Sequence, residues 1–108
     1  MTFENSRNIL ITGGLGFIGS NLIRKLLLDT NHKIFNLDFD GYASSNDAFL
    51  DLFSKKDIYF KRYKYFNVDL SEFNKVEKVL NDINPDAIFH FAAESHVDRS
   101  IDNPYPFI

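Results

Sequence analysis

The chain has 108 residues, a length that suits one small domain rather than two. Hydrophobic residues make up 44% of it and charged residues 25%, which is ordinary for a globular protein and excludes an intrinsically disordered one. A net charge of -3 gives no electrostatic reason to expect a nucleic acid or an anionic membrane as a partner. Without cysteine, disulfides and thiolate metal sites are excluded, and no metal site is expected.

The sequence also argues against a membrane or secreted location. It contains no apolar run near the roughly 20 residues that a membrane-spanning helix needs. Residues Met1 to Arg7 lack the apolar segment of a signal peptide. We therefore expect a cytoplasmic protein.

Two kinds of apolar segment alternate along the chain. Short continuous runs are typical of strands buried on both faces of a sheet, whereas longer segments repeat apolar residues every three or four positions, as amphipathic helices do. Ser71 stands at the expected N-cap of the last helix, and Asn84-Pro85 is expected to end it. The expected strands are 8–12, 33–38, 64–68 and 87–91. The expected helices are 17–29, a short one at 47–53, and a last one that follows Ser71 and has an apolar face from Phe73 to Ile83.

This order of elements predicts the fold class. Strands that alternate with crossover helices form a parallel sheet with helices on both faces. We expect an α/β protein with a Rossmann-type doubly wound parallel sheet that is incomplete at the C-terminus. Residues 1–108 would then be the N-terminal part of a truncated domain of the Rossmann type.

A glycine-rich segment, Thr12 to Ser20, joins the first strand to the first helix with the spacing G-x-x-G-x-x-G. Gly13 would let the chain turn off the strand, Gly16 would let the backbone approach a pyrophosphate, and Gly19 would let the helix pack against the sheet. The amides at the start of that helix favour a diphosphate anion. The alternative is that these glycines serve only as turn residues.

An acid follows at the end of the second strand. Asp38 lies 19 residues after Gly19, near the position of the carboxylate that hydrogen-bonds the adenosine ribose in dinucleotide-binding proteins. Its charge would repel the 2′-phosphate of NADP, so NAD is the expected cofactor. Alternatively, Asp38 only caps the following turn.

Two segments carry a family resemblance. Residues 12–20 read TGGLGFIGS, the opening typical of extended short-chain dehydrogenase/reductases. Residues 84–101 read NPDAIFHFAAESHVDRSI, and this segment, above all residues 92–100, resembles dTDP-glucose 4,6-dehydratases. The likeness spans nearly all of residues 8–108 and is weakest at 39–62, where Asp40 and Gly41 depart from the D-K-L-T-Y-A-G-like stretch of the family.

The resemblance implies roles for further residues. Phe17 and Ile18 would flank the pyrophosphate through their backbone amides. The other residues that it assigns to the cofactor are Asp69 and Leu70 at the adenine, Ala92 and Ala93 on the nicotinamide ribose side, and Ser95, which would touch substrate or cofactor. Other interpretations remain open for several of these residues: Asp69 as part of the helix start, the alanines as small residues at a strand exit, and two histidines, His90 and His96, as structural groups.

The resemblance also implies that catalysis lies elsewhere. The superfamily uses a tyrosine and a lysine four residues later, and none of the tyrosines here has that lysine. We therefore expect no catalytic residue before Ile108. The parent enzyme would be a homodimer that uses NAD to convert dTDP-glucose to dTDP-4-keto-6-deoxyglucose. Alternatives are another NAD-dependent sugar-nucleotide epimerase, dehydratase or decarboxylase, or a non-catalytic nucleotide-binding fragment.

Overall fold

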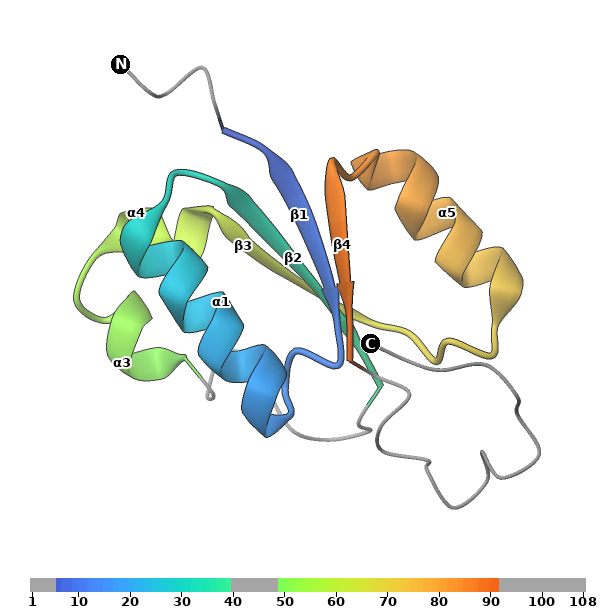
Figure 1. The fold of residues 1–108 in the computed structure, drawn as a ribbon, viewed down its shortest axis with the longest axis horizontal. Coiled ribbons are helices and arrows are strands. Elements are labelled where there is room, and N and C mark those ends of the chain that lie inside the picture. The colour runs from blue at the N-terminus through green and yellow to red at the C-terminus, as the bar shows by residue number, and fades with distance from the viewer. Residues whose placement is uncertain (1–5, 40–48, 92–108) are drawn as a thin grey trace.

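The computed structural model describes residues 6–39 and 49–91, and within them the chain forms one parallel sheet with helices on both faces (Figure 1). The four strands lie in the order β3-β2-β1-β4. Their bounds are Asn8–Thr12 for β1, Lys33–Asp38 for β2, Tyr63–Asn67 for β3 and Ala87–His90 for β4. The expected α/β class and Rossmann-type arrangement are confirmed.

Each face of the sheet has its own helices. The helix α1 (Phe17–Asp29) and two short helices, α3 (Leu50–Phe53) and α4 (Asp57–Lys61), lie on one side, and α5 (Phe73–Ile83) covers the other (Figure 1). Within the described residues, no helix combines the length and the apolar character that crossing a bilayer requires.

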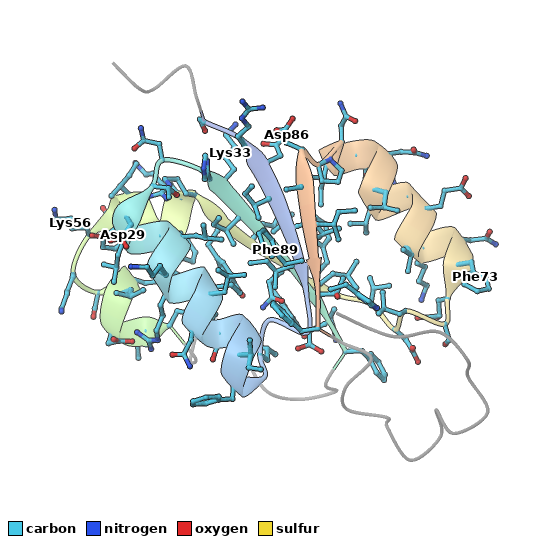
Figure 2. All side chains as sticks on the ribbon, viewed as in Figure 1. Asp29, Lys33, Lys56, Phe73, Asp86 and Phe89 are labelled. Atoms are coloured by element: carbon cyan, nitrogen blue, oxygen red, sulfur yellow. The ribbon has the colours of Figure 1, made fainter. Side chains whose placement is uncertain are left out.

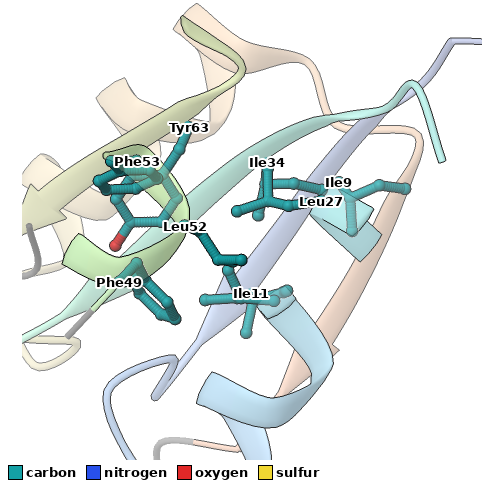
Figure 3. Packing of buried hydrophobic residues seen from close by; sticks show 9 residues of the cluster. Ile9, Ile11, Leu27, Ile34, Phe49, Leu52, Phe53 and Tyr63 are labelled. Atoms are coloured by element: carbon teal, nitrogen blue, oxygen red, sulfur yellow. The ribbon is translucent and has the colours of Figure 1, made fainter. Parts of the chain in front are cut away.

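The core is divided by the sheet into two clusters, because successive side chains of a strand point to opposite faces. In β1, Ile9 and Ile11 face α1, and Leu10 faces α5. The cluster on the α1 side, shown in Figure 3, consists of Ile9, Ile11, Ile23, Leu27, Ile34, Phe49, Leu52, Phe53 and Tyr63. The cluster on the α5 side consists of Leu10, Leu37, Val79 and Ile83.

Most element bounds agree with the sequence, and the differences have local causes. The bounds of β1, α1 and β2 are as predicted, whereas β3 begins at Tyr63 and β4 ends at His90. The helix α4 was not predicted, because five residues are too few to show a helical repeat. The predicted N-cap of α5 was wrong: its N-cap is Glu72, since the Asp69 carboxylate accepts the Ser71 N–H (3.0 Å) in a turn that precedes the helix.

Arg62 fixes the far end of α1. Its guanidinium donates hydrogen bonds to four backbone carbonyl oxygens, two in the last turn of the helix and two in the segment just after it. They are those of Leu26 (3.2 Å), Leu27 (3.1 Å), Thr30 (2.6 Å) and His32 (2.9 Å). Because α1 has no basic residue in its own last turn, Arg62 supplies the cation that favours a helix C-terminus.

The helix α5 ends on a residue in a left-handed conformation. Asn84 has a φ of 51° and a ψ of 64°, and its N–H donates to the Leu80 carbonyl (2.8 Å). This conformation costs most residues about 1 kcal/mol, and asparagine and glycine adopt it most readily.

We therefore expect Asn84→Ala to lower the free energy of unfolding by about 1 kcal/mol, measured by urea denaturation. Asn84→Gly is the matched control and should leave stability within about 0.5 kcal/mol of the parent. Equal stability of the alanine and glycine variants would contradict this explanation of the helix end.

Candidate functional site

The glycine loop that joins β1 to α1 turns sharply after Thr12. Gly13 has a φ of 76°, a left-handed value that favours glycine, and its N–H donates to the Leu37 carbonyl of β2 (3.0 Å). Its own carbonyl then accepts the Gly16 N–H (3.1 Å). These two bonds turn the backbone over the end of β2 and into the helix.

Gly19 allows α1 to pack directly on this loop. A Cβ at Gly19 would lie 2.8 Å from the Gly14 Cα and 3.1 Å from the Gly13 carbonyl carbon, and it would overlap the Gly13 oxygen. Those neighbours are backbone atoms that no side-chain rotation can move. A side chain at this position would therefore push the helix away from the loop.

Gly16 stands in a different environment. A Cβ there would meet only the Gly13 oxygen at 3.4 Å, an ordinary contact distance. The fold itself therefore does not demand glycine at this position. Its lack of a side chain leaves the space next to the start of α1 open, as expected if the phosphate of a ligand is to come close to the protein backbone.

Two side chains of β2 hold the loop from one face. Residues 36 and 38 point to the same side of the strand. The Asn36 Oδ1 accepts the Gly14 N–H (3.0 Å), and the Asp38 Oδ2 accepts the Leu15 N–H (3.0 Å). Asp38 also accepts the Phe39 N–H through Oδ1 (2.7 Å), so its carboxylate is fixed at the rim of the loop. The turn that the alternative interpretation places after Asp38 lies outside the described residues.

Gly14 and Asn36 were missed by the sequence analysis. Gly14 stands outside the G-x-x-G-x-x-G spacing, yet a Cβ there would lie 2.5 Å from the Asn36 Cγ and 2.6 Å from the Ile23 Cδ1. A signal was present in the sequence. Asn36 is the one uncharged polar residue in the strand KIFNLD, and a buried amide in such a run calls for hydrogen-bond partners.

The start of α1 is exposed above the loop. The side chain of Phe17 is 83% exposed and that of Ile18 is 52% exposed. The N-cap residue, Gly16, has no side chain to cap the helix, so the amides of the first turn have no side-chain partner at that position. The helix dipole adds a partial positive charge there, and this combination favours an anion.

The strand order places the loop at a topological switch point. From β1 the chain moves outward to β2 and β3 and then returns to the other side of β1 as β4. In open α/β sheets, ligands bind beyond the carboxyl ends of the strands at this point. Here Thr12 and His90 end their strands side by side and form a hydrogen bond (Oγ1 to Nδ1, 2.6 Å), so His90 has a structural contact.

The remaining predicted residues fall into two groups. Asp69 and Leu70 follow β3 at the same end of the sheet, where Leu70 packs against the α5-side cluster and Asp69 makes the turn before α5. Ala92, Ala93 and Ser95 lie outside the described residues, as do the Asp40-Gly41 departure and His96. No group of three or more potential metal ligands occurs in residues 6–39 and 49–91.

Comparisons with known proteins identify the family of the chain. The family model for GDP-mannose 4,6 dehydratase matches residues 10–108. A dTDP-glucose 4,6-dehydratase of Neisseria gonorrhoeae is 38% identical over 108 residues, which are 100% of this chain and 30% of that protein. A dTDP-glucose 4,6-dehydratase of Haemophilus influenzae is 41% identical over 94% of this chain and 28% of that protein. The chain thus spans less than a third of the length of these curated relatives.

Solved structures show the same fold. A dTDP-glucose 4,6-dehydratase of Bacillus anthracis, crystallised in complex with NAD, superposes with a TM-score of 0.67 at 29% identity, over 85% of this chain and 28% of that one. A UDP-N-acetylglucosamine 4-epimerase of Methanobrevibacter ruminantium gives a TM-score of 0.61 at 28% identity, over 92% of this chain and 28% of that one. The resemblance to dTDP-glucose 4,6-dehydratases is confirmed, and the chain belongs to the GDP-mannose 4,6 dehydratase family.

Proposed function

We propose that residues 1–108 form the N-terminal, NAD-binding part of a dTDP-glucose 4,6-dehydratase. The observation that carries this proposal is the glycine loop. Asn36 and Asp38 hold its backbone from below, and the open start of α1 lies above it. A loop of this kind, followed by a fixed carboxylate, fits a dinucleotide diphosphate and its adenosine ribose.

Each loop residue has a proposed part in binding the cofactor. The diphosphate would lie against Gly16 and the backbone amides of Phe17 and Ile18, where the helix dipole favours its charge. Gly13 and Gly19 would act indirectly, since they let the loop and the helix approach each other.

Asp38 would select the cofactor at the ribose. Each of its carboxylate oxygens accepts one backbone N–H and retains a further lone pair for a ribose hydroxyl. A 2′-phosphate at the same place would meet a fixed negative charge, which disfavours NADP. By resemblance, Asp69 and Leu70 would contact the adenine, Ala92 and Ala93 the nicotinamide ribose side, and Ser95 the substrate or cofactor.

The proposed reaction of the whole protein is the conversion of dTDP-glucose to dTDP-4-keto-6-deoxyglucose, by a homodimer in the cytoplasm. NAD, when bound, supplies a hydride acceptor that returns the hydride to the sugar, so the reaction needs no external oxidant. No tyrosine of these 108 residues is followed by a lysine four positions later, so this chain provides cofactor binding and not the proton transfer. This proposal is supported by the similarity to the Neisseria gonorrhoeae and Haemophilus influenzae proteins, both of which are named dTDP-glucose 4,6-dehydratase.

A chimera tests the function directly. The matched segment of the Haemophilus influenzae dehydratase would be replaced by this chain, and dTDP-glucose turnover would be followed by the appearance of the 4-keto sugar. We expect product, because this segment then completes a cofactor site that suits the same reaction. A chimera that binds NAD and forms no keto product would contradict the dehydratase assignment and leave a nucleotide-binding role.

The charge of Asp38 can be tested separately. We expect Asp38→Asn to bind NAD several-fold more weakly and to lower the preference for NAD over NADP about tenfold, a change of about 1.4 kcal/mol. The asparagine retains one oxygen for the Leu15 N–H, and the exposed Phe39 N–H, which loses its acceptor, can bond to water instead, so the loop itself should survive.

Dissociation constants for both cofactors, measured by isothermal titration calorimetry, would check this prediction. The control is Asp29→Asn, which removes a carboxylate at the opposite end of α1 (Figure 2). An unchanged preference in Asp38→Asn would show that this carboxylate does not face the ribose.

A further inference from the structure

A polar side chain lies within the apolar cluster on the α1 side of the sheet. Asn36 has 0% of its surface exposed, and its neighbour on the same face of β2 is the core residue Ile34. Burying an amide costs free energy unless each of its groups finds a partner, whereas an apolar residue of similar size carries no such cost. Packing alone therefore gives no reason for an asparagine here.

The amide of Asn36 is oriented by a contact with β3. Its Nδ2 donates to the Tyr63 hydroxyl (2.9 Å), which leaves Oδ1 as the acceptor for the Gly14 N–H (3.0 Å). The Tyr63 ring is held in turn by the rings of Phe49 and Phe53, with centroid distances of 5.3 and 5.4 Å. The core thus determines which end of the amide faces the glycine loop.

Gly14 is matched to this amide. With its N–H directed at Oδ1, any side chain on Gly14 would overlap the Asn36 amide and approach the Ile23 side chain to 2.6 Å. The two residues therefore constrain each other: the glycine leaves room for the amide, and the amide takes the inward N–H of the loop. Asp38 takes the next N–H, that of Leu15 (3.0 Å).

We propose that Asn36 is a positioning residue for cofactor binding, which acts through Gly14 on the glycine loop and does not touch the cofactor. By accepting the Gly14 N–H, it fixes the orientation of the peptide plane between Gly13 and Gly14. The loop continues from this plane to Gly16 and the start of α1. Tyr63 supports it by orienting the amide. This inference rests on the proposed NAD site.

The test uses Asn36→Leu, which keeps a similar volume and removes both hydrogen bonds. We expect the NAD dissociation constant to rise at least tenfold, measured by calorimetry at a temperature where circular dichroism shows the variant folded. Tyr63→Phe removes only the hydroxyl that orients the amide and should raise the constant by a smaller factor, about threefold, since a single hydrogen bond has a modest net effect. If Asn36→Leu does not fold, Tyr63→Phe decides the question.

A control and a second ligand separate positioning from a general loss of stability. Val79→Ala destabilises the core on the opposite face of the sheet and should leave the NAD dissociation constant within twofold. Adenosine, which has no phosphate, should bind Asn36→Leu as it binds the parent, because its contacts do not involve the loop amides. If the parent chain binds NAD and neither Asn36→Leu nor Tyr63→Phe changes the dissociation constant, this inference alone is overturned. If the parent chain is folded and binds no NAD, the proposed function on which this inference rests is overturned as well.

Discussion

Gly19→Ala is expected to lower the free energy of unfolding by about 2 kcal/mol and to abolish measurable NAD binding. The added Cβ would overlap the Gly13 oxygen and lie 2.8 Å from the Gly14 Cα, so either the helix or the loop must move. Movement of the helix would separate the α1 amides from the loop that completes the proposed phosphate site. Urea denaturation would measure the stability and calorimetry the binding.

Gly16→Ala is the matched control, since it adds the same methyl group three residues earlier. Its Cβ would meet only the Gly13 oxygen at an ordinary 3.4 Å, but alanine is a poorer N-cap than glycine, so we expect the free energy of unfolding to fall by no more than about 1 kcal/mol. NAD binding should nevertheless weaken, because the methyl group would enter the space proposed for the diphosphate. Normal NAD affinity in Gly16→Ala, or normal stability in Gly19→Ala, would contradict the roles given to these two glycines.

The second large effect is expected at Arg62. Replacing it with methionine, which keeps an unbranched apolar stem, should lower the free energy of unfolding by about 3 kcal/mol. The substitution leaves the carbonyls of Leu26, Leu27, Thr30 and His32 without the guanidinium that now binds them. Burial lowers the pKa of Arg62, yet an arginine stays protonated at any pH at which the protein is studied, so the loss should not depend on pH between 6 and 9, roughly.

A thermal melt would show this effect as a fall in Tm of about 10 °C or more. Arg62→Lys tests the geometry: an ammonium group keeps the charge but has no planar fork, so it should recover only part of the loss. NAD affinity of the folded variant should stay near that of the parent, because Arg62 holds the end of α1 that is remote from the glycine loop. Full stability in Arg62→Met would mean that these hydrogen bonds contribute nothing in water.

The parts of the fold that follow from local pattern were predictable from the sequence. The strand NILIT is buried on both faces, so it reads as a continuous apolar run, and its bounds agree with the structure. Gly13 and Gly19 were identified from their spacing, and the structure gives each a steric reason, a positive φ for Gly13 and a backbone overlap for Gly19. The cofactor roles assigned to these residues remain proposals.

What could not be predicted depends on contacts between distant residues. The bond between Asn36 and Gly14 joins positions 22 residues apart, and the bonds of Arg62 to the end of α1 span still more of the chain. No periodicity encodes such pairs, because they form only when the sheet has brought the strands together. Ser71 was wrongly expected to cap α5 because hydroxyls are common N-caps, whereas here Asp69 makes a turn first.

The measurement that tests the central claim most directly is a calorimetric titration of this chain with NAD, with NADP as the competing ligand. If the glycine loop, the start of α1 and Asp38 form a dinucleotide site, one NAD should bind per chain, and NADP should bind at least tenfold more weakly. A chain that circular dichroism shows to be folded, and that binds neither cofactor at millimolar concentration, would contradict the account.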